Sequence, residues 1–183
     1  MSSPIILAID EGTTNAKAVA VNREGQIVGR CGVGVSISHP APGLAEQDPM
    51  AIWQAVVEAI NGCLQQAGPV EIAGIAISNQ RESVLVWQRA DGKPLTPVVS
   101  WQDRRSESRC AQLQADGHGA LITQRTGLPV DPLFPAAKIS ALLAALPDGV
   151  MRAERGELCI GTLDSWLNWQ FTAGRAFTTD YAN

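Results

Sequence analysis

Paired cysteines and clustered histidines are missing from this sequence of 183 residues. It holds four cysteines and two histidines, and no Cys-x-x-Cys pair occurs among them. Structural zinc sites need closely spaced ligands, so the usual zinc spacings are excluded. Scattered cysteines without a pairing pattern also indicate free thiols in a reducing compartment. We therefore expect a cytoplasmic protein.

Runs of one charge and long apolar runs are equally scarce. The 14 basic and 18 acidic residues leave a formal net charge of -4, and the closest approach to a basic run, DRRSESR, alternates in sign. Nucleic-acid binding needs a dense basic face, so a nucleic-acid partner is disfavoured. The apolar run IILAI near the N-terminus has no basic flank and is too short for a signal peptide or a membrane span. We expect no membrane partner.

The residues that are present form the pattern of an α/β protein. Short apolar stretches joined by turns predict three antiparallel strands, at 5–10, 16–21 and 26–37. Asp48 is predicted as the N-cap of a helix with Pro49 at its first position. The nearly continuous apolar run 72–78 predicts a central strand. Further strands are predicted at 84–88, 97–101 and 157–160, and further helices at 104–115, 136–146 and 163–172. This order predicts a mixed sheet with flanking helices.

A polar turn separates the first two predicted strands. Asp10 ends the first strand, and a carboxylate there can hold Mg²⁺ directly or through water. Gly12 lets the backbone approach a ligand, and successive amides of such a turn form an anion-binding concavity. Thr13 and Thr14 add hydroxyl donors, and Lys17 brings a cation suited to a phosphate. The turn is not a Walker A loop, and a polar hairpin loop is the alternative interpretation.

Five motifs along the chain, taken in their order, resemble those of a known family. The DEGTT turn resembles the first phosphate loop of the actin-like ATPase superfold. Downstream come SNQRES, VVSWQDRR, TGLPVDPLFPAAK and RGELCIGTLDSWLNWQFTAGRAFTTDYAN. Together, from Ile5 to Asn183, they resemble the N-terminal half of the FGGY carbohydrate kinases and are most similar to the glycerol kinases. The resemblance implies an actin-like ATPase (ribonuclease H-like) domain.

The resemblance implies roles for the first turn. Asp10 would lie near Mg²⁺, while Thr13 and Thr14 would contact the phosphates of ATP. Glycerol kinases usually carry glutamine where this chain has Glu11, which points away from Asp10 and is interpreted as tolerated rather than catalytic. Lys17 stands where they have arginine, which keeps the charge but loses the bidentate fork.

The resemblance also implies an acceptor site. Arg81 and Glu82 would hydrogen-bond the hydroxyls of a small polyol or sugar, because guanidinium donates to hydroxyls and carboxylate accepts from them. An exposed ion pair is the alternative for these two residues. Trp101 would pack against the carbon skeleton of the substrate, or else it is a core tryptophan at a strand end.

Two departures from the glycerol kinases concern the acceptor. Leu133 replaces the tyrosine of their DPYF motif, and Ala141 replaces a tryptophan. Losing a hydrogen-bonding phenol leaves a substrate group unpaired or changes the substrate. A sugar or polyol other than glycerol, such as a tetritol or a pentulose, is therefore open as the acceptor.

The implied activity is transfer of the γ-phosphoryl group of ATP to a primary hydroxyl, with Mg²⁺ as cofactor. The family's catalytic base and adenosine pocket lie beyond this chain. We therefore expect residues 1–183 to be an incomplete N-terminal kinase domain without the C-terminal nucleotide-binding domain. The alternative is a truncated, non-catalytic actin-like module with at most weak ligand binding. An unrelated nucleotide-binding α/β protein would leave 79–183 unexplained, and a homo-oligomer is left open.

Overall fold

The computed structural model describes residues 4–183, and the chain forms two compact units. The first unit comprises the chain up to Ile37 together with Gln47–Gln80. The second unit comprises Ser38–Glu46 and Arg81–Asn183. No helix within the described range is long and apolar enough to cross a membrane.

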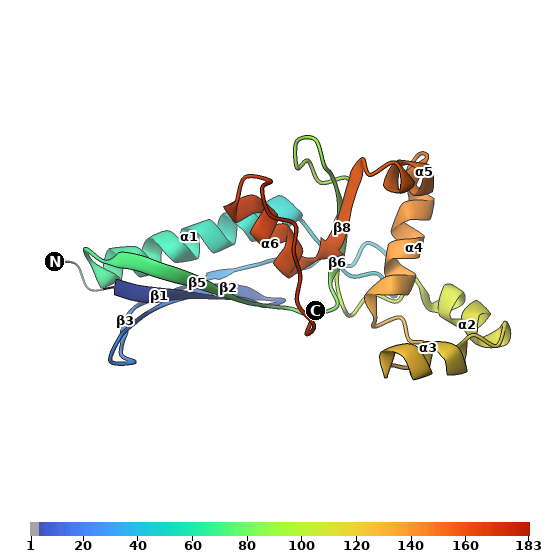
Figure 1. The fold of residues 1–183 in the computed structure, drawn as a ribbon, viewed down its shortest axis with the longest axis horizontal. Helices are drawn as coiled ribbons and strands as arrows, with labels where there is room; N and C mark the ends of the chain where they lie inside the picture. The colour runs from blue at the N-terminus through green and yellow to red at the C-terminus, as the bar shows by residue number, and fades with distance from the viewer. Residues whose placement is uncertain (1–3) are drawn as a thin grey trace. The chain divides into compact units, whose positions relative to one another are not determined.

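The first unit is built on a four-stranded mixed sheet of order β3-β2-β1-β5. β1 pairs antiparallel with β2, β2 pairs antiparallel with β3, and β5 runs parallel to β1 (Figure 1). The predicted mixed sheet with three antiparallel N-terminal strands is thereby confirmed. The strands are β1 (Pro4–Glu11), β2 (Asn15–Asn22), β3 (Ile27–Gly34) and β5 (Glu71–Asn79).

Helix α1 (Pro49–Ala67) covers one face of this sheet. Its predicted start is confirmed: the Asp48 carboxylate accepts from the backbone N–H groups of Met50 at 2.8 Å and Ala51 at 3.3 Å. The helix ends at Gly68, whose φ of 73° suits a residue without a side chain. The core between helix and sheet consists of small and aliphatic residues: Ile5, Leu7, Ala18, Ala20, Ala59 and Cys63.

Helix α1 and strand β3 approach each other closely at Gly29. A Cβ atom added there would lie 2.3 Å from the Cys63 carbonyl oxygen and 2.9 Å from the Ala67 nitrogen. The register between β2 and β3 also shifts next to this point, between Ala20 and Val21. The glycine thus permits contact between backbones that any side chain would push apart.

Strand β5 differs from its prediction. It was predicted to be central, but among the described residues it lies at the end of the sheet and pairs only with β1. Ile72 is 43% exposed and Ile75 is 49% exposed. Ile6 on β1 is also exposed, because it points away from α1. A continuous apolar run therefore indicated a strand here, but it did not fix the strand's place in the sheet.

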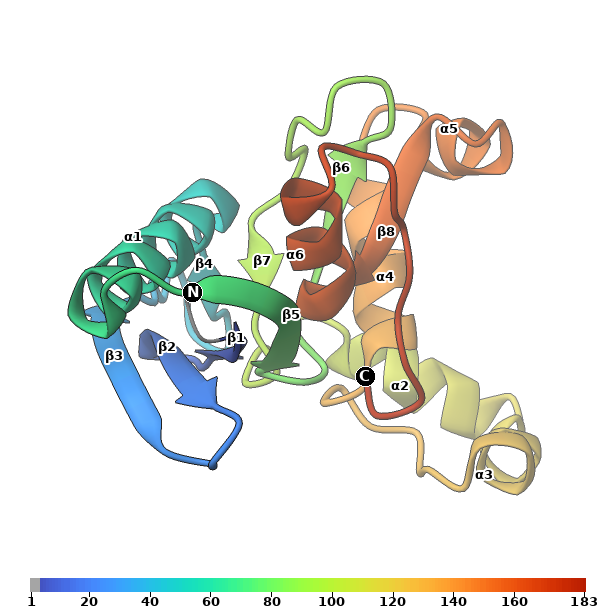
Figure 2. The ribbon, with the colours of Figure 1, turned by 60° about the vertical axis from the view of Figure 1, so that its left-hand side comes forward.

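A second sheet has the order β4-β7-β6-β8 and lies mostly in the second unit. The strands predicted at 84–88, 97–101 and 157–160 are confirmed as β6, β7 and β8 of this sheet, whereas the sequence pattern had predicted a single mixed sheet. β6 pairs antiparallel with both β7 and β8. Both faces of β6 are buried: Val84 and Val86 pack with Leu142 of α4 (Pro135–Ala145), while the Trp87 ring lies edge to face with that of Trp166 on α6 (Leu163–Phe171), with 5.4 Å between the ring centroids. Figure 2 shows α4 and α6 on opposite sides of β6 and β8. The strands are β4 (Glu46–Gln47), β6 (Val84–Gln88), β7 (Val98–Val99) and β8 (Leu158–Thr162).

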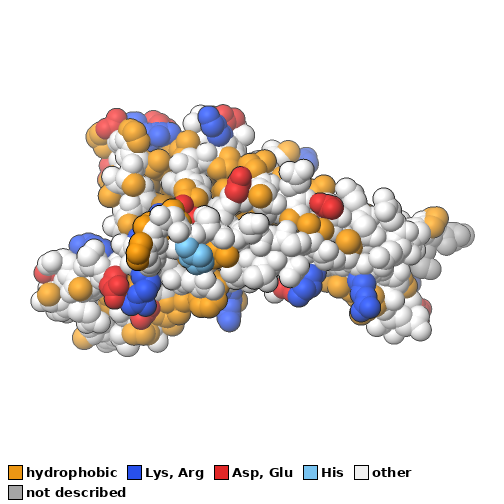
Figure 3. Space-filling model, turned by 180° about the vertical axis from the view of Figure 1, so that it is seen from behind, with side chains coloured by type: hydrophobic (Ala, Val, Ile, Leu, Met, Phe, Trp, Pro, Cys, Tyr) orange, Lys and Arg blue, Asp and Glu red, His pale blue; other side chains and the backbone are white. Residues whose placement is uncertain are grey.

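Five helices complete this unit. Three of them, α2, α4 and α6, correspond to predicted helices, whereas α3 and α5 fall in stretches without a prediction. The helices are α2 (Glu107–Ala115), α3 (Gly119–Thr126), α4 (Pro135–Ala145), α5 (Gly149–Glu154) and α6 (Leu163–Phe171). On the face drawn in Figure 3, acidic and basic side chains are interspersed.

Candidate functional site

The predicted phosphate loop is the connection from β1 to β2. Asp10 and Lys17 lie directly opposite each other in the antiparallel register, and Lys17 Nζ is 3.4 Å from Asp10 Oδ2. Both side chains are 56% exposed, on the sheet face opposite α1. An exposed pair of this kind adds little stability, so both charges are available to a ligand.

The turn between the strands is closed by its own backbone. The Gly12 N–H donates to the Asn15 carbonyl at 2.9 Å, and the Thr14 carbonyl accepts from the Val35 N–H at 2.9 Å. The amide of Gly12 therefore shapes the turn. Thr14 is exposed, and Thr13 is half-buried.

Buried polar side chains hold this turn from the α1 side of the sheet. Gln80, directly after β5, donates through Nε2 to Glu11 Oε1 at 3.0 Å and to Gln47 Oε1 at 2.8 Å. Gln47 in turn donates to the Thr13 carbonyl at 2.9 Å and to the Ser36 carbonyl at 3.3 Å. The Thr13 hydroxyl reaches Gln80 Oε1 at 3.5 Å. The buried side chains of Glu11, Gln47 and Gln80 thus connect the turn to the ends of β1 and β5.

Glu11 is fully buried in this network. The alternation predicted for β1 is confirmed, since Asp10 faces solvent and Glu11 faces the core. Burial raises the pKa of the Glu11 carboxyl to about 7, although hydrogen bonds from Gln80 act in the opposite direction. Its Oε2 atom has no hydrogen-bond partner among the described residues. A buried carboxyl with one unpartnered oxygen favours the protonated form.

The groups at the turn fit a magnesium–nucleotide ligand. A carboxylate oxygen suits Mg²⁺, and hydroxyls and an ammonium group suit phosphate oxygens. Asp10, Thr13, Thr14 and Lys17 supply these groups within eight residues of chain. They also lie at the carboxyl end of β1, which is where open α/β sheets bind their ligands.

In the second unit, Trp101 and Leu133 line one cavity of about 310 Å³. Trp101 is 41% exposed, and its backbone N–H donates to the Ser83 hydroxyl at 3.1 Å. The Trp101 side chain is therefore accessible to a ligand, as its predicted contact with a substrate requires. The other residues that line the cavity are Gln102, Asp103, Arg104, Asp131 and Pro132.

Arg81 and Glu82 do not line that cavity. Arg81 is exposed, and Glu82 is half-buried with a φ of 68°, in the left-handed region that residues with a side chain rarely adopt. Such backbone strain is frequent at binding sites. Among the salt bridges of the described residues, none joins Arg81 to Glu82.

Lys138, on the first turn of α4, was missed by the sequence analysis. Its side chain is fully buried, and Nζ donates to the Glu82 carbonyl at 3.1 Å and to the Leu133 carbonyl at 2.6 Å. Burial lowers the pKa of Lys138 to about 8, against the opposite effect of the nearby carboxylates of Asp103, Glu82 and Asp131. A lysine inside the otherwise apolar start of a helix, PAAKISALL, was the available signal.

A buried acid supports the strand end that carries Trp101. Asp103 accepts from the Ala45 N–H at 2.7 Å and from Arg105 Nε at 2.8 Å, and Arg105 also reaches Glu46 at 2.6 Å. Burial acts to raise the pKa of Asp103, but the hydrogen bonds from Arg105 and Ala45 outweigh it and hold the pKa below its usual value. The SWQDRR motif therefore combines one exposed ring with a buried ionic support.

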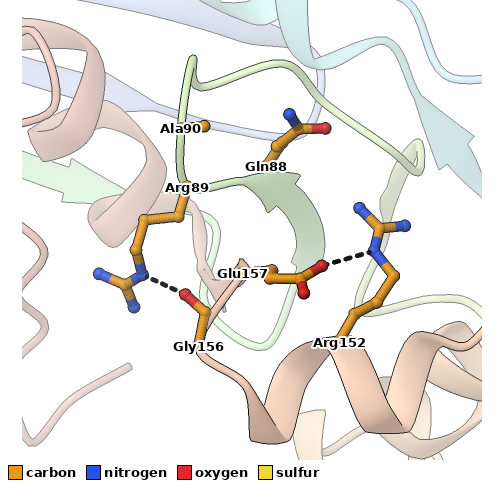
Figure 4. A pocket seen from close by; sticks show the side chains of 6 residues that line it. All are labelled: Gln88, Arg89, Ala90, Arg152, Gly156 and Glu157. Carbon is orange, nitrogen blue, oxygen red and sulfur yellow. Dashed lines mark hydrogen bonds and ion pairs between the residues drawn. The ribbon is translucent and has the colours of Figure 1, made fainter.

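A second cavity of about 320 Å³ lies between the β6 end and the turn after α5 (Figure 4). Arg89 and Arg152 lie on opposite sides of Glu157 in this view. Arg89 Nε donates to the Gly156 carbonyl at 2.9 Å, and Glu157 pairs with Arg152 at 3.4 Å and with Arg155 at 2.6 Å. Arg152 and Glu157 in this cavity therefore pair with each other, whereas Arg89 is bonded to a backbone carbonyl.

Known proteins resemble the chain over its whole length. The model of the "FGGY family of carbohydrate kinases, N-terminal domain" matches residues 5–183. An apulose kinase of Pectobacterium atrosepticum is 61% identical over 183 residues, which are 100% of this chain and 37% of that protein. A glycerol kinase of Xanthobacter autotrophicus is 47% identical over 180 residues, which are 97% of this chain and 36% of that protein.

Solved structures give the same result. The structure of Plasmodium falciparum glycerol kinase with ADP superimposes with a TM-score of 0.88 at 28% identity, covering 100% of this chain and 39% of that one. The predicted fold class, an actin-like ATPase domain with a mixed sheet and flanking helices, is confirmed. The chain spans about 37% of the length of the apulose kinase that it matches.

Proposed function

The chain belongs to the FGGY family of carbohydrate kinases, and on this basis we propose that the full-length protein transfers the γ-phosphoryl group of ATP to a primary hydroxyl of a small sugar or polyol. The observation that carries the proposal is the turn after β1. It gathers Asp10, Thr13, Thr14 and Lys17 at one strand end and is fixed there by a buried network. A plain hairpin loop needs no such support.

In this proposal the turn binds the nucleotide phosphates. Asp10 holds Mg²⁺, the hydroxyls of Thr13 and Thr14 donate to phosphate oxygens, and Lys17 adds positive charge beside them. Gly12 shapes the turn through its bond to the Asn15 carbonyl. Bound Mg²⁺–ATP supplies the phosphoryl group and part of the charge that stabilises its transfer. The residues of the turn contribute position and electrostatic stabilisation, which is what phosphoryl transfer chiefly requires.

The acceptor is bound by residues of the second unit. The Glu82 carboxylate accepts hydrogen bonds from substrate hydroxyls and the Arg81 guanidinium donates to them. Trp101 offers an exposed ring to the carbon skeleton. Leu133 lines the same cavity as Trp101 with an aliphatic side chain, where the glycerol kinases that the motif resembles carry a phenol.

We propose a sugar rather than glycerol as the preferred acceptor. The relative at 61% identity is named an apulose kinase, whereas the relative at 47% is named a glycerol kinase. An aliphatic Leu133 leaves no phenol to pair with a glycerol hydroxyl, and a polar site discriminates strongly by such pairs. The cavity of about 310 Å³ has room for more than three carbon atoms with their hydroxyls.

We further propose that the base that takes the hydroxyl proton, and the adenosine pocket, lie outside residues 1–183. The relatives are nearly three times as long as this chain, which leaves room for a second domain. The isolated 183-residue chain should then show negligible turnover. A cytoplasmic location also remains our proposal, and it is supported by the free thiols of all four cysteines.

The test is an acceptor screen on the full-length protein. ADP production from Mg²⁺–ATP is measured with glycerol, tetritols, pentuloses and hexuloses, and the phosphorylated product is identified by mass spectrometry. We expect one sugar to be preferred over glycerol, and we expect Glu82→Gln to lower kcat/KM for that sugar. Lack of turnover with every acceptor would favour a non-catalytic module instead. A preference for glycerol would refute the substrate proposal but leave the kinase proposal intact.

A further inference from the structure

Lys138 is a buried cation whose position on an apolar helix calls for a reason. Desolvating an ammonium group is costly unless its protons are hydrogen-bonded, and an aliphatic residue of similar size would pack in the same place. The neighbours of Lys138 on the same helix, Ala137 and Leu142, are buried apolar residues. The charge is therefore not needed to bury the helix.

The partners of Lys138 are backbone groups of two proposed acceptor residues. One Nζ atom donates to the carbonyl of Glu82, at the end that leads into β6, and to the carbonyl of Leu133, in the loop that leads into α4. These residues lie 51 positions apart in the sequence, so the ammonium group joins two segments that no backbone ladder connects. The bond to Leu133, at 2.6 Å, is short, as charge-assisted bonds are.

The Glu82 backbone is the part of this arrangement that most needs support. Its φ of 68° places a residue with a long side chain in the left-handed region, and such a conformation persists only where neighbours over-determine it. The next residue, Ser83, is fully buried and accepts from the Trp101 N–H at 3.1 Å. Lys138 binds the carbonyl of Glu82, which directly precedes Ser83 in the chain. The direction of the Glu82 carboxylate therefore depends on Lys138.

We propose that Lys138 is a positioning residue of the acceptor site, which fixes Glu82 and Leu133 relative to each other so that acceptor hydroxyls and carbon atoms meet preset partners. The inference rests on the proposed function, because it assumes that Glu82 and Leu133 contact the acceptor. Lys138 itself is buried beneath both segments and does not contact the acceptor. Its effect is on acceptor binding and not on the phosphate loop, whose residues belong to the first unit.

The experiment uses the full-length protein and the acceptor that the screen identifies. KM and kcat are determined for the acceptor and for ATP in Lys138→Met, which keeps the volume and removes the donors, and in Lys138→Gln, which keeps one amide donor. Lys93→Met, at an exposed loop position, is the matched control. Thermal unfolding is followed for every variant. If Lys138→Met does not fold, Lys138→Gln decides by the same criteria.

We expect the KM for the acceptor to rise about tenfold or more in Lys138→Met, since misplacing a binding group by about 1 Å can cost up to 10²-fold. The rise should be smaller in Lys138→Gln and absent in Lys93→Met, and the KM for ATP should stay within about twofold. Parallel rises in both KM values, or a loss of melting temperature with unchanged acceptor KM, would show general structural support and overturn the inference. A wild-type protein without any acceptor would instead refute the proposed function, and the positioning role with it.

Discussion

Gln80 donates its side-chain amide to Glu11 Oε1 at 3.0 Å, so that the residue after β5 holds the last residue of β1. The same amide donates to Gln47, which binds the Thr13 carbonyl. A buried carboxyl thus takes part in fixing the proposed phosphate loop. Because burial raises the pKa of its carboxyl, Glu11 makes the stability of this end of the sheet sensitive to pH.

The first prediction concerns Glu11→Gln in the full-length protein. Burial raises the pKa of Glu11 from 4.5 to about 7, so the folded protein binds a proton that the unfolded chain releases between these values. The stabilisation is complete below about pH 4.5 and is lost as the pH rises to about 7, by up to roughly 3 kcal/mol. Glutamine does not titrate, so the variant lacks this dependence.

The measurement is the difference in melting temperature between wild type and Glu11→Gln at pH 5, 6, 7 and 8. We expect the wild type to lose several degrees relative to the variant across this range. Glu58→Gln, on helix α1, serves as the control, because Glu58 is exposed and takes no part in the hydrogen bonds between Glu11, Gln80 and Gln47. Parallel pH profiles of wild type and Glu11→Gln would contradict the prediction.

Asp10 is predicted to act on the nucleotide and not on the fold. In Asp10→Asn, kcat/KM for Mg²⁺–ATP should fall on the order of 10²-fold, since a charge that stabilises the transferred group is lost. The melting temperature should change little, because the pair with Lys17 is exposed. Asp48→Asn is the matched control, since asparagine also caps helices well. Steady-state kinetics at varied Mg²⁺ give the answer, and a kcat/KM for Mg²⁺–ATP equal to that of wild type would remove Asp10 from the site.

Leu133 is predicted to select against glycerol. Leu133→Tyr introduces a phenol at the cavity shared with Trp101 and should raise kcat/KM for glycerol, relative to the preferred sugar, by about tenfold, the value of one good hydrogen bond. Leu128→Tyr, at an exposed leucine earlier in the same loop, should leave the ratio unchanged. Competition between the two acceptors in one reaction measures this ratio. An unaltered ratio in Leu133→Tyr would mean that this position does not contact the acceptor.

Gly29 is predicted to be essential for the packing of α1 on the sheet. A methyl group there would lie 2.3 Å from the Cys63 carbonyl, so Gly29→Ala should destabilise the protein by about 1–3 kcal/mol. Gly32→Ala on the same strand is the control, since the nearest atom to its added Cβ is Lys17 Cγ at 3.6 Å. Thermal or urea unfolding distinguishes them. Equal stabilities of the two variants would show that helix and strand can separate without cost.

Local patterns predicted much of this fold. The first two strands, the cap at Asp48 and the helix after it are each determined by a few consecutive residues, through alternation, turn chemistry and capping. The predictions were weaker where an element depends on distant partners. Helices α3 and α5 are short, have little apolar periodicity and were not predicted. Strand β7 was predicted at 97–101, but only two of these residues pair as a strand, through the contact of Val99 with Val84. The place of β5 in its sheet also depends on which strands pair with it.

The residues of the candidate sites show the same difference between local patterns and contacts with distant segments. Asp10, Thr13, Thr14 and Lys17 share one turn, so the sequence alone determined that they would lie together. The supports of the sites come from elsewhere in the chain: Gln80 lies 69 positions from Glu11, and Lys138 lies 56 positions from Glu82. Only the tertiary structure decided that Glu11 is a buried partner of Gln80 and that Lys138 joins Glu82 to Leu133. The physical reason is that burial and hydrogen bonding between distant segments depend on packing, which no short stretch of sequence specifies.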